Sequence, residues 1–545
     1  MNELPRIIAE ILKEKGITAL RPPQELSIKA GVLEGKNIVV SSPTSSGKTL
    51  VAEMAAVKHF ENKGKTLYIV PLKSLANEKY ADLRKKYEPY GLRCALSIGD
   101  LDEKDPYLAQ FDIVITTCEK ADSLIRHEAP FIRGLTCVVI DEVHLIDDET
   151  RGPTLEILIT RLKEMLPKAQ FLALSATISN DKELSDWLSA VLVKSDYRPI
   201  KLYEGVFFND TLYFEEKSYT IEKKVRDEVS ITYDTLKRSK QVLFFLGSRR
   251  NTESLASNLA KYVAPFLNDN EREKLDVLAD KVLYALEQPT EQCRKLAELV
   301  RLGVGFHHAG LVNSQREVIE TGFRERLIKA LCATPTLAAG INLPAFRVVI
   351  RDLTRFSQSQ GNYYIPVLEV KQMSGRAGRP GLEDYGEAIL IAKSECDKEA
   401  LFKEYINGEV EKVYSKLGVE PVLRTHVLAL IANRLTINHD SLKKFFSRTF
   451  YAKQFGNLSM INALLENVVT SLERWGFVEK EGNNFFATSL GTRVSELYLD
   501  PLTASKIIEG IKNTTRTKPS SFNVLQTLCF SGGVKLLGIG NKDFL

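Results

Sequence analysis

The chain has 545 residues, 44% of them hydrophobic and 26% charged, which excludes a disordered chain, a collagen-like repeat and a small disulfide-linked scaffold. Its 74 basic residues against 70 acidic ones give a net charge of +4. This charge neither requires nor excludes a nucleic-acid partner, because a basic groove can coexist with a near-neutral total. At about 150 residues per domain, the length predicts three to four domains.

The first predicted element is a helix near the N-terminus. Ile7, Ile8, Ile11 and Leu12 stand between charged residues at helical spacing, which is typical of a soluble helix and not of a signal peptide. No apolar run reaches the roughly 18 residues of a membrane span. The seven cysteines form no CxxC pair, so we expect neither a zinc site nor an iron–sulfur cluster. Together these features predict a cytoplasmic monomer without a membrane partner.

Short β-branched runs then alternate with helical patterns as far as about residue 198. Near-continuous apolar strands between helices predict a parallel sheet covered on both faces. Arg198 and Pro199 indicate a boundary, because the residue before a proline disfavours helix. The expected strands are Asn37–Ser41, Thr66–Val70, Cys94–Ile98, Ile113–Thr116, Cys137–Ile140 and Phe171–Leu174.

The same alternation resumes after residue 200 and predicts a second parallel sheet, with a charged helical insertion at 271–302. Two consecutive α/β domains create a cleft between them. The expected strands are Gln241–Phe245, Val304–Phe306, Lys329–Cys332, Val348–Ile350 and Ala388–Ile391.

Helices replace this alternation from about residue 406. An apolar stripe from Ile461 to Trp475 predicts one helix, and a hairpin over residues 477–487 follows it, a combination that suggests a winged helix. The last segment begins as a helix and ends in a glycine-rich stretch. The expected domains are 1–199 and 200–405, both α/β, then a winged helix at 406–500 and an incomplete helical segment at 501–545.

A phosphate-binding loop is expected between the first strand and the helix Leu50–Phe60. Strand, loop, Gly-Lys-Thr and helix form the context that such a loop needs, because backbone N–H groups at a helix start bind phosphate. Lys48 would reach the β- and γ-phosphates of ATP, and the Thr49 hydroxyl would bind Mg²⁺. The loop residues are Ser42, Pro43, Thr44, Ser45, Ser46, Gly47, Lys48 and Thr49, with Ser42 where glycine is usual; the alternative is a serine-rich turn.

Acidic residues follow the apolar strand Cys137–Ile140. Carboxylates at the C-terminal end of a parallel strand face the same crevice as the phosphate loop. Asp141 would bind Mg²⁺, and Glu142 would orient or deprotonate the attacking water. The alternative is an ordinary loop start. His144 is expected to hydrogen-bond across the cleft and not to hold a metal.

At this point the sequence resembles the superfamily two helicases of the Ski-like branch, whose box reads Asp-Glu-Val-His. Among them it most resembles archaeal repair DNA helicases, which are similar to the helicase domain of DNA polymerase theta. The resemblance covers about residues 18 to 500. The further motifs that carry it are Arg21–Gln24, Pro71–Ala76, Thr116–Asp122, Ser175–Thr177, His307–Leu311, Thr334–Pro344 and Gln372–Arg379.

The resemblance implies two tandem RecA-like domains and an ATP-dependent DNA helicase with 3′-to-5′ polarity, acting on single-stranded or forked DNA in repair at stalled forks. Gln24 would read adenine. Hydroxyls such as Ser74 and Thr117 would grip phosphates without reading bases. An RNA helicase of the same branch is the alternative, because the motor motifs bind the nucleic-acid backbone and do not distinguish DNA from RNA. A more remote alternative is a phosphate-loop ATPase that does not act on nucleic acid.

Three residues of the last motif belong to the predicted catalytic set. Arg376 and Arg379 are three residues apart, so on a helix they would share a face and stabilise charge on the γ-phosphoryl group as arginine fingers. Gln372 would contact nucleotide or water. These side chains belong to the second domain and Lys48 to the first, so catalysis would require the cleft to close. The alternative is a pair of surface salt bridges.

A hairpin is expected over Val348–Val367, with a polar tip at residues 357–362 and aromatic residues Phe356, Tyr363 and Tyr364. The resemblance implies that it splits the duplex; the alternative is an ordinary surface hairpin. The family continues with a helical ratchet domain, of which residues 501–545 would be an incomplete part, and the final stretch Gly532–Leu545 does not resemble it. We therefore expect nucleic-acid-stimulated ATPase with weaker unwinding than that of a longer relative.

Overall fold

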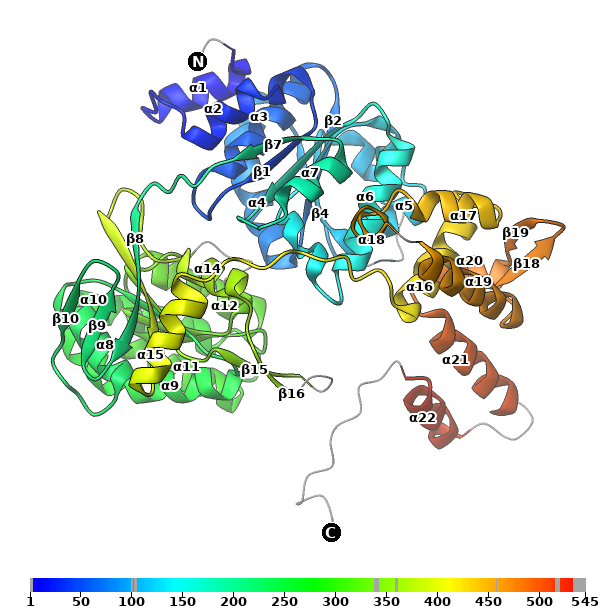
Figure 1. Ribbon diagram of the computed structural model, residues 1–545. Helices are drawn as coiled ribbons and strands as arrows, with labels where there is room; N and C mark the ends of the chain where they lie inside the picture. The colour runs from blue at the N-terminus through cyan, green and yellow to red at the C-terminus, as the bar shows by residue number, and fades with distance from the viewer. Residues whose placement is uncertain are drawn as a thin grey trace.

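The structure is a computed structural model that describes residues 3–99, 101, 105–337, 343–357, 361–456, 458–514 and 520–532. Figure 1 shows two α/β bodies, one in blue to cyan and one in green to yellow, and a helical region in orange to red beside the first. The fold class expected from the sequence, two parallel-sheet domains followed by a winged helix and helical tail, is confirmed.

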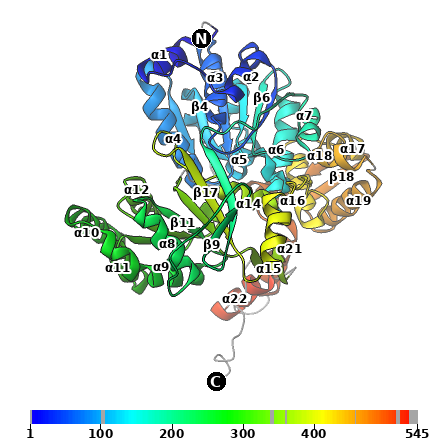
Figure 2. The same ribbon diagram turned by 60° about the vertical axis from the view of Figure 1, so that its left-hand side comes forward.

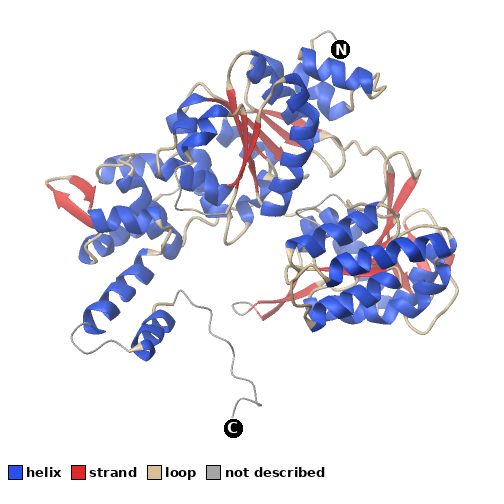
Figure 3. Ribbon diagram, turned by 180° about the vertical axis from the view of Figure 1, so that it is seen from behind, coloured by secondary structure: helices blue, strands red, loops and turns tan. Residues whose placement is uncertain are grey.

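The first sheet has seven strands in the order β3-β4-β2-β5-β6-β1-β7, and every pairing in it is parallel. Figure 3 shows its strands enclosed by helices on both sides. All six predicted strands are present. The strands are β1 (Ile38–Ser41), β2 (Lys65–Val70), β3 (Cys94–Ser97), β4 (Ile113–Thr117), β5 (Leu135–Ile140), β6 (Gln170–Ser175) and β7 (Val191–Lys194), and the helices include α1 (Arg6–Glu14), α2 (Pro22–Lys29), α3 (Lys48–Glu61), α4 (Lys73–Tyr87), α5 (Cys118–Arg126), α6 (Gly152–Met165) and α7 (Asp181–Leu188).

The seventh strand, β7, was not predicted. It is an edge strand that pairs with β1 alone, and only one of its four residues is buried. A strand that is mostly exposed lacks the continuous apolar run that identified the others. The sequence pattern therefore found the buried strands and missed the edge.

The second sheet has eight strands in the order β10-β9-β8-β17-β14-β11-β13-β12. The five predicted strands are present and pair in parallel, as expected. Three further strands were not predicted: β8 joins β17 in parallel, and β9 and β10 continue the sheet through antiparallel pairings. In β9 and β10 more and less buried residues alternate, as in strands with one solvated face, whereas β8 has an exposed to half-buried first half and buried residues only at Gly205, Val206 and Phe207. The strands are β8 (Lys201–Phe208), β9 (Thr211–Phe214), β10 (Ser218–Thr220), β11 (Val242–Phe245), β12 (Val304–His307), β13 (Ala330–Ala333), β14 (Arg347–Ile350) and β17 (Tyr385–Ile391).

Helices cover the second sheet, and the charged insertion at 271–302 is helical as predicted. It consists of two helices that pack on each other and contribute Leu275, Leu278 and Leu296 to the core. The helices include α8 (Asp227–Lys237), α9 (Arg249–Val263), α10 (Asp269–Leu283), α11 (Glu291–Arg301), α12 (Asn313–Arg324), α14 (Val367–Ser374) and α15 (Glu395–Leu401).

A two-stranded hairpin projects from the second domain (Figure 1). It consists of β15 (Thr354–Ser357) and β16 (Gly361–Tyr364). The predicted hairpin therefore began too early, because Val348–Ile350 belongs to strand β14 of the central sheet. Part of the predicted polar tip, residues 358–360, lies outside the described residues.

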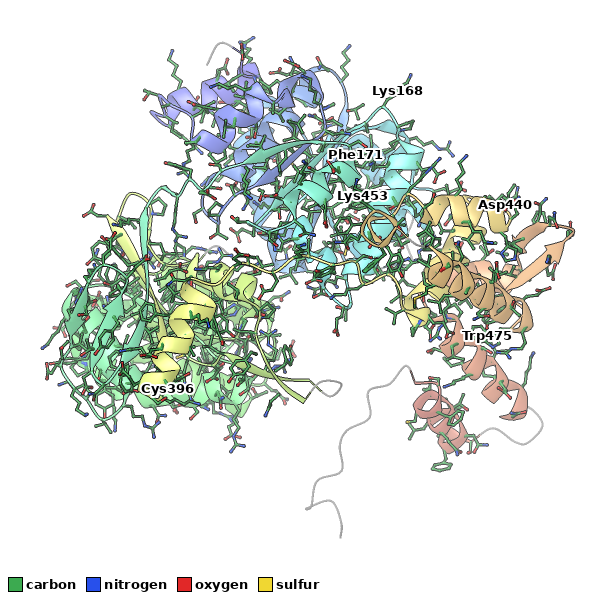
Figure 4. All side chains as sticks on the ribbon, in the orientation of Figure 1. Lys168, Phe171, Cys396, Asp440, Lys453 and Trp475 are labelled. Atoms are coloured by element: carbon green, nitrogen blue, oxygen red, sulfur yellow. The ribbon has the colours of Figure 1, made fainter. Side chains whose placement is uncertain are left out.

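The third region has the predicted helix and hairpin. In α19, residues Ile461, Leu465, Val468 and Leu472 are buried in one core, and β18 and β19 pair antiparallel after it. Trp475, labelled in Figure 4, follows the end of α19. The glycine-rich stretch from residue 533 lies outside the described residues. The elements are α16 (Glu420–Ala432), α17 (His439–Phe446), α18 (Phe450–Phe455), α19 (Ser459–Arg474), β18 (Val478–Glu481), β19 (Asn484–Ala487), α20 (Ser489–Glu496), α21 (Pro501–Thr514) and α22 (Ser521–Phe530).

The third region packs against the first domain through buried charges. Asp122 binds the guanidinium groups of Arg126 and Arg161, and Arg126 also donates to the Ser495 carbonyl at 3.0 Å. Burial alone would raise the pKa of Asp122, but the two arginines lower it below its ordinary value. Because breaking one partner of a buried ion cluster is costly, this contact fixes the third region to the first domain. Figure 2 shows the two side by side.

None of the helices in the described part of the chain has the length and apolar character that a bilayer crossing requires.

Candidate active site

The predicted phosphate loop links β1 to α3 through two residues in the left-handed region, Ser45 (φ 64°) and Gly47 (φ 99°). A Cβ at position 47 would lie 2.5 Å from Gln24 Nε2, so glycine is required there. The Ser42 and Ser46 hydroxyls lie 2.8 Å apart and close the loop. Ser42 thus supplies a hydrogen bond where the usual loop has glycine.

The predicted adenine-reading segment supports the back of this loop. Gln24 Nε2 donates to the Gly47 carbonyl at 3.1 Å, and Arg21 Nη1 donates to the Ser45 carbonyl at 2.8 Å. Gln24 Oε1 accepts from the Arg21 backbone N–H at 2.9 Å. The structure therefore places Gln24 in direct contact with the loop, 23 residues away in sequence.

Lys48 is buried and lies over the loop. Its Nζ donates to the carbonyls of Ser42 (2.5 Å) and Pro43 (3.3 Å). Burial lowers the pKa of Lys48, while the negative charges of Glu142 and Asp141 act in the opposite direction. Lysine and both acidic residues therefore share one buried site, as the strand order predicts, since β1 and β5 both end at this edge of the sheet.

Asp141 has three fixed partners. The Tyr68 hydroxyl donates to Oδ2 at 3.1 Å, Lys79 Nζ lies 3.6 Å from the same oxygen, and the Glu142 backbone N–H donates to Oδ1 at 3.1 Å. Burial raises the pKa of Asp141, and Lys79 opposes this shift. Lys79 also donates to Thr49 Oγ1 at 2.9 Å. Lys79 was not predicted, since its position on α4 gives no signal of a contact with the loop.

The residues predicted to hold Mg²⁺ offer the ligands that this ion prefers, a hydroxyl from Thr49 and a carboxylate from Asp141. A positive charge, the Lys79 ammonium group, already lies between them. The donor set therefore fits a small, hard cation that also binds phosphate oxygens.

Glu142 and His144 follow in a strained turn. Glu142 has a positive φ of 53°, in the sparsely populated left-handed region, and its side chain is 25% exposed. His144 Nδ1 accepts from the Ala176 N–H at 3.2 Å, which connects the acidic box to the Ser175–Thr177 segment. Burial lowers the pKa of His144 to about 3, so the ring is neutral near pH 7.

The second domain reaches this site through α14. As expected, His144 bonds across the cleft: its Nε2 lies 2.7 Å from the Gln372 side-chain amide. The atom of Gln372 in this contact is its amide nitrogen, Nε2, so the contact joins the helix of the second domain to the acidic box of the first. A Cβ at position 375 would lie 2.0 Å from Thr44 Oγ1, so Gly375 permits the close approach of the two domains.

The structure brings Arg376 to the site but not Arg379. Burial lowers the pKa of Arg376, and the charges of Glu142 and Glu78 oppose this shift, so its guanidinium group lies within electrostatic range of the acidic box. Arg379 Nε instead donates to the Pro344 carbonyl at 2.7 Å, and its guanidinium lies over the Phe323 ring.

The premise that Arg376 and Arg379 share a helix face was wrong. Helix α14 ends at Ser374, and Gly378 has a φ of 87°. The residues between the two arginines therefore turn the chain, and the two side chains point to different surroundings.

The cleft between the domains has a volume of about 1470 Å³. It contains Thr49 and Lys79 of the site just described, and also Ser74 and Thr117, which were predicted to grip a phosphate backbone. Three arginines line it as well: Arg151, Arg316 and Arg324. One cleft therefore contains both the loop side of the phosphate site and hydroxyl and guanidinium groups suited to a polyanion.

The two adjacent histidines have carboxylate partners. His307 Nε2 lies 3.0 Å from Glu320, and His308 Nε2 lies 3.3 Å from Glu253. Within the described ranges, no group of three or more His, Cys, Asp or Glu residues is arranged to hold a metal ion. Part of the predicted motif at 334–344, residues 338–342, lies outside the described residues.

Comparison with protein families gives three matches in chain order. Residues 21–185 match the DEAD/DEAH box helicases, residues 258–381 the helicase conserved C-terminal domain, and residues 386–479 a helix-turn-helix domain. Together with the two sheets and the phosphate loop of the first domain, these matches define an ATP-hydrolysing helicase. The alternative of a phosphate-loop ATPase that does not act on nucleic acid is thereby excluded.

Curated relatives give the family. The ATP-dependent DNA helicase Hel308 of Methanocella arvoryzae is 44% identical, over 99% of this chain and 73% of the relative. The Hel308 helicases of Pyrococcus horikoshii and Methanococcus vannielii are each 41% identical, over 98% and 92% of this chain and 73% of each relative. The chain belongs to the Hel308 family of ATP-dependent DNA helicases.

Proposed function

We propose that the chain moves 3′ to 5′ along one DNA strand, driven by Mg²⁺-dependent ATP hydrolysis at the contact between its two α/β domains, and that it acts on forked DNA in repair. The observation that carries this proposal is the meeting of the two domains at the phosphate loop. Gln372 contacts His144, Gly375 lies against Thr44, and Arg376 lies within electrostatic range of Glu142.

Each residue of the proposed site has one role. The loop from Ser42 to Thr49 binds the phosphates, and Lys48 turns from the loop carbonyls to the β- and γ-phosphates. Thr49 and Asp141 hold Mg²⁺, which when bound neutralises charge on the phosphate oxygens. Gln24 fixes the loop and lies where adenine would bind. Glu142 positions the attacking water and removes its proton.

Motif residues of the second domain complete the site. Arg376 stabilises the charge that spreads over the γ-phosphoryl oxygens during transfer. Gln372 holds the two domains in their relative position through its contact with His144. Arg379 keeps the segment after α14 in place through the Pro344 carbonyl. Since these groups belong to a different domain from Lys48, closing the cleft assembles the site, and release of phosphate lets it open.

We propose the domain limits 1–199, 200–405, 406–500 and 501–545. The first two are supported by the sheets, since β7 ends at Lys194 and β8 of the second sheet begins at Lys201. The third begins where α15 and the short helix after it end, and it has its own apolar core.

The projecting hairpin is the proposed wedge. Its strand β16 carries Tyr364, whose side chain is one of the exposed aromatic groups of the second domain. An exposed ring at the junction can replace the base stacking that is lost on strand separation. The hairpin is also connected to the motor, because Arg355 on β15 forms an ion pair with Glu369 of α14.

Replacing Tyr364 with alanine is expected to lower the rate of duplex unwinding about tenfold, because one stacking contact is lost. DNA-stimulated ATP hydrolysis should stay near the wild-type rate, since the residue lies outside the phosphate site. Tyr284→Ala is the matched control, as Tyr284 is equally exposed but follows α10. Equal unwinding rates for the two variants would rule out the wedge.

The polarity is tested with two duplexes of the same sequence, one with a 3′ single-stranded tail and one with a 5′ tail. We expect ATP-dependent unwinding of the 3′-tailed duplex only. Preference for the 5′ tail would contradict the proposed direction.

A further inference from the structure

The segment that leaves the second domain crosses back over the first domain before it reaches α16; it is drawn in yellow in Figure 1. Residues 411–416 of this segment, here named the strap, contact both domains. The strap is anchored to the first domain at one end and to α14 of the second domain at the other, and α14 leads to Gln372 and Arg376.

The first-domain anchor is centred on Val413, which is buried in the core of that domain. Its backbone N–H donates to Asn180 Oδ1 at 2.9 Å, and its carbonyl accepts from Asn180 Nδ2 at 2.9 Å. The next residues are also held: the Tyr414 N–H donates to Asp147 at 3.1 Å, and the Ser415 hydroxyl donates to Glu156 at 2.5 Å. Residues 413–416 therefore move with the first domain.

The other contact is made by Glu411. Its two carboxylate oxygens accept from the backbone N–H groups of Val367 (2.7 Å) and Leu368 (3.0 Å), the first two residues of α14. The residue before them, Pro366, makes no side-chain cap. Glu411 therefore supplies the cap that the helix lacks, and its negative charge is favourable at a helix N-terminus.

Helix α14 is itself fixed to the second domain. Lys371 Nζ donates to Glu204 of β8 at 2.7 Å and to the Ile406 carbonyl at 2.9 Å. Only one residue, Lys412, separates Glu411 from Val413, and the two extended steps between them span about 7 Å. The second domain cannot swing far from the first without breaking the bonds between Glu411 and α14.

We propose that Glu411 is a positioning residue for ATP hydrolysis: by capping α14 from a strap fixed on the first domain, it holds Arg376 in the closed arrangement and must release the helix when the cleft opens. This inference rests on the proposed function of Arg376. The helix has eight residues, about 12 Å, so a shift at its capped end is transmitted to the motif that follows its other end.

The test compares Glu411→Ala with Glu409→Ala, an exposed glutamate two residues earlier. At saturating ATP and single-stranded DNA, Glu411→Ala is expected to lower kcat about fivefold, because the closed arrangement loses the stabilisation of a helix cap, which changes an equilibrium by about that factor. Glu411→Gln retains one acceptor oxygen, so its kcat should lie between that of the wild type and that of Glu411→Ala. Binding of ADP, a property of the first-domain loop, should not change. Hydrogen exchange at the Val367 and Leu368 amides should rise in Glu411→Ala only.

A second variant distinguishes positioning from simple capping. Asn180→Ala removes the two hydrogen bonds that hold the Val413 backbone on the first domain, which loosens the strap next to Glu411, and it leaves the carboxylate of Glu411 free to cap α14. It is expected to lower kcat as well, and the double variant should lose no more than the larger single loss, because both act through one strap. Thermal unfolding of each variant checks that the fold is retained.

A wild-type kcat in Glu411→Ala, or equal losses in Glu411→Ala and Glu409→Ala, would overturn the inference. So would fully additive losses in the double variant. If the wild-type chain itself shows no DNA-stimulated ATP hydrolysis, the proposed function is wrong. If the wild type is active and the variants behave as the wild type does, the role of the strap is wrong.

Discussion

Replacement of Arg376 by alanine is expected to lower DNA-stimulated ATP hydrolysis by about 10³- to 10⁵-fold, the usual effect of removing an arginine finger. The residue is half-buried within electrostatic range of the acidic box of the opposite domain, where reduced access of water makes its charge more effective. ATP binding should change little, because Lys48 and the loop belong to the first domain.

Single-turnover hydrolysis and binding of a fluorescent ATP analogue separate these two effects. Arg301→Ala is the control, since Arg301 is an ion-paired residue on α11 of the same domain. Loss of ATP binding together with hydrolysis, or no loss of hydrolysis at all, would show that Arg376 does not act on the transition state.

Replacement of Glu142 by glutamine is expected to abolish turnover while ATP binding is retained. The amide is nearly the same size as the carboxylate, so the turn at φ 53° is not strained further. It cannot accept a proton from water, and loss of a general base lowers rates by about 10²- to 10⁴-fold. The closed, ATP-bound state should therefore accumulate.

The measurement is steady-state phosphate release beside equilibrium ATP binding. Glu61→Gln is the control, because Glu61 is an exposed glutamate at the far end of α3 from the phosphate loop. Full ATP hydrolysis in a clean preparation of Glu142→Gln would remove its assignment as the base.

Much of the fold could be predicted because buried parallel strands are continuous apolar runs. All eleven predicted strands exist, and the missed ones are the edge strand β7 and the half-exposed β8, β9 and β10. In an exposed strand, polar residues interrupt the apolar ones, so its short sequence pattern resembles that of a loop. The hairpin limits were misjudged for a related reason, since Val348–Ile350 is apolar enough for either position.

The site residues could be predicted where they directly follow a strand along the chain. The loop from Ser42 to Thr49 and the acidic pair follow strands, and parallel strands end at the same edge of a sheet. Lys79 could not be found in this way, because its contacts with Thr49 and Asp141 arise only when α4 packs on the sheet. The separation of Arg376 from Arg379 depends on the end of α14, and helix ends are poorly determined by sequence.

The account depends on a single claim, that ATP hydrolysis at the contact between the two domains is coupled to DNA. The most direct test is the ATP hydrolysis rate of the purified chain without nucleic acid, with single-stranded DNA and with RNA of the same sequence. We expect DNA to raise the rate at least about tenfold, an increase that corresponds to about 1.4 kcal/mol of barrier, and RNA to raise it less. A rate indifferent to every polynucleotide would contradict the account.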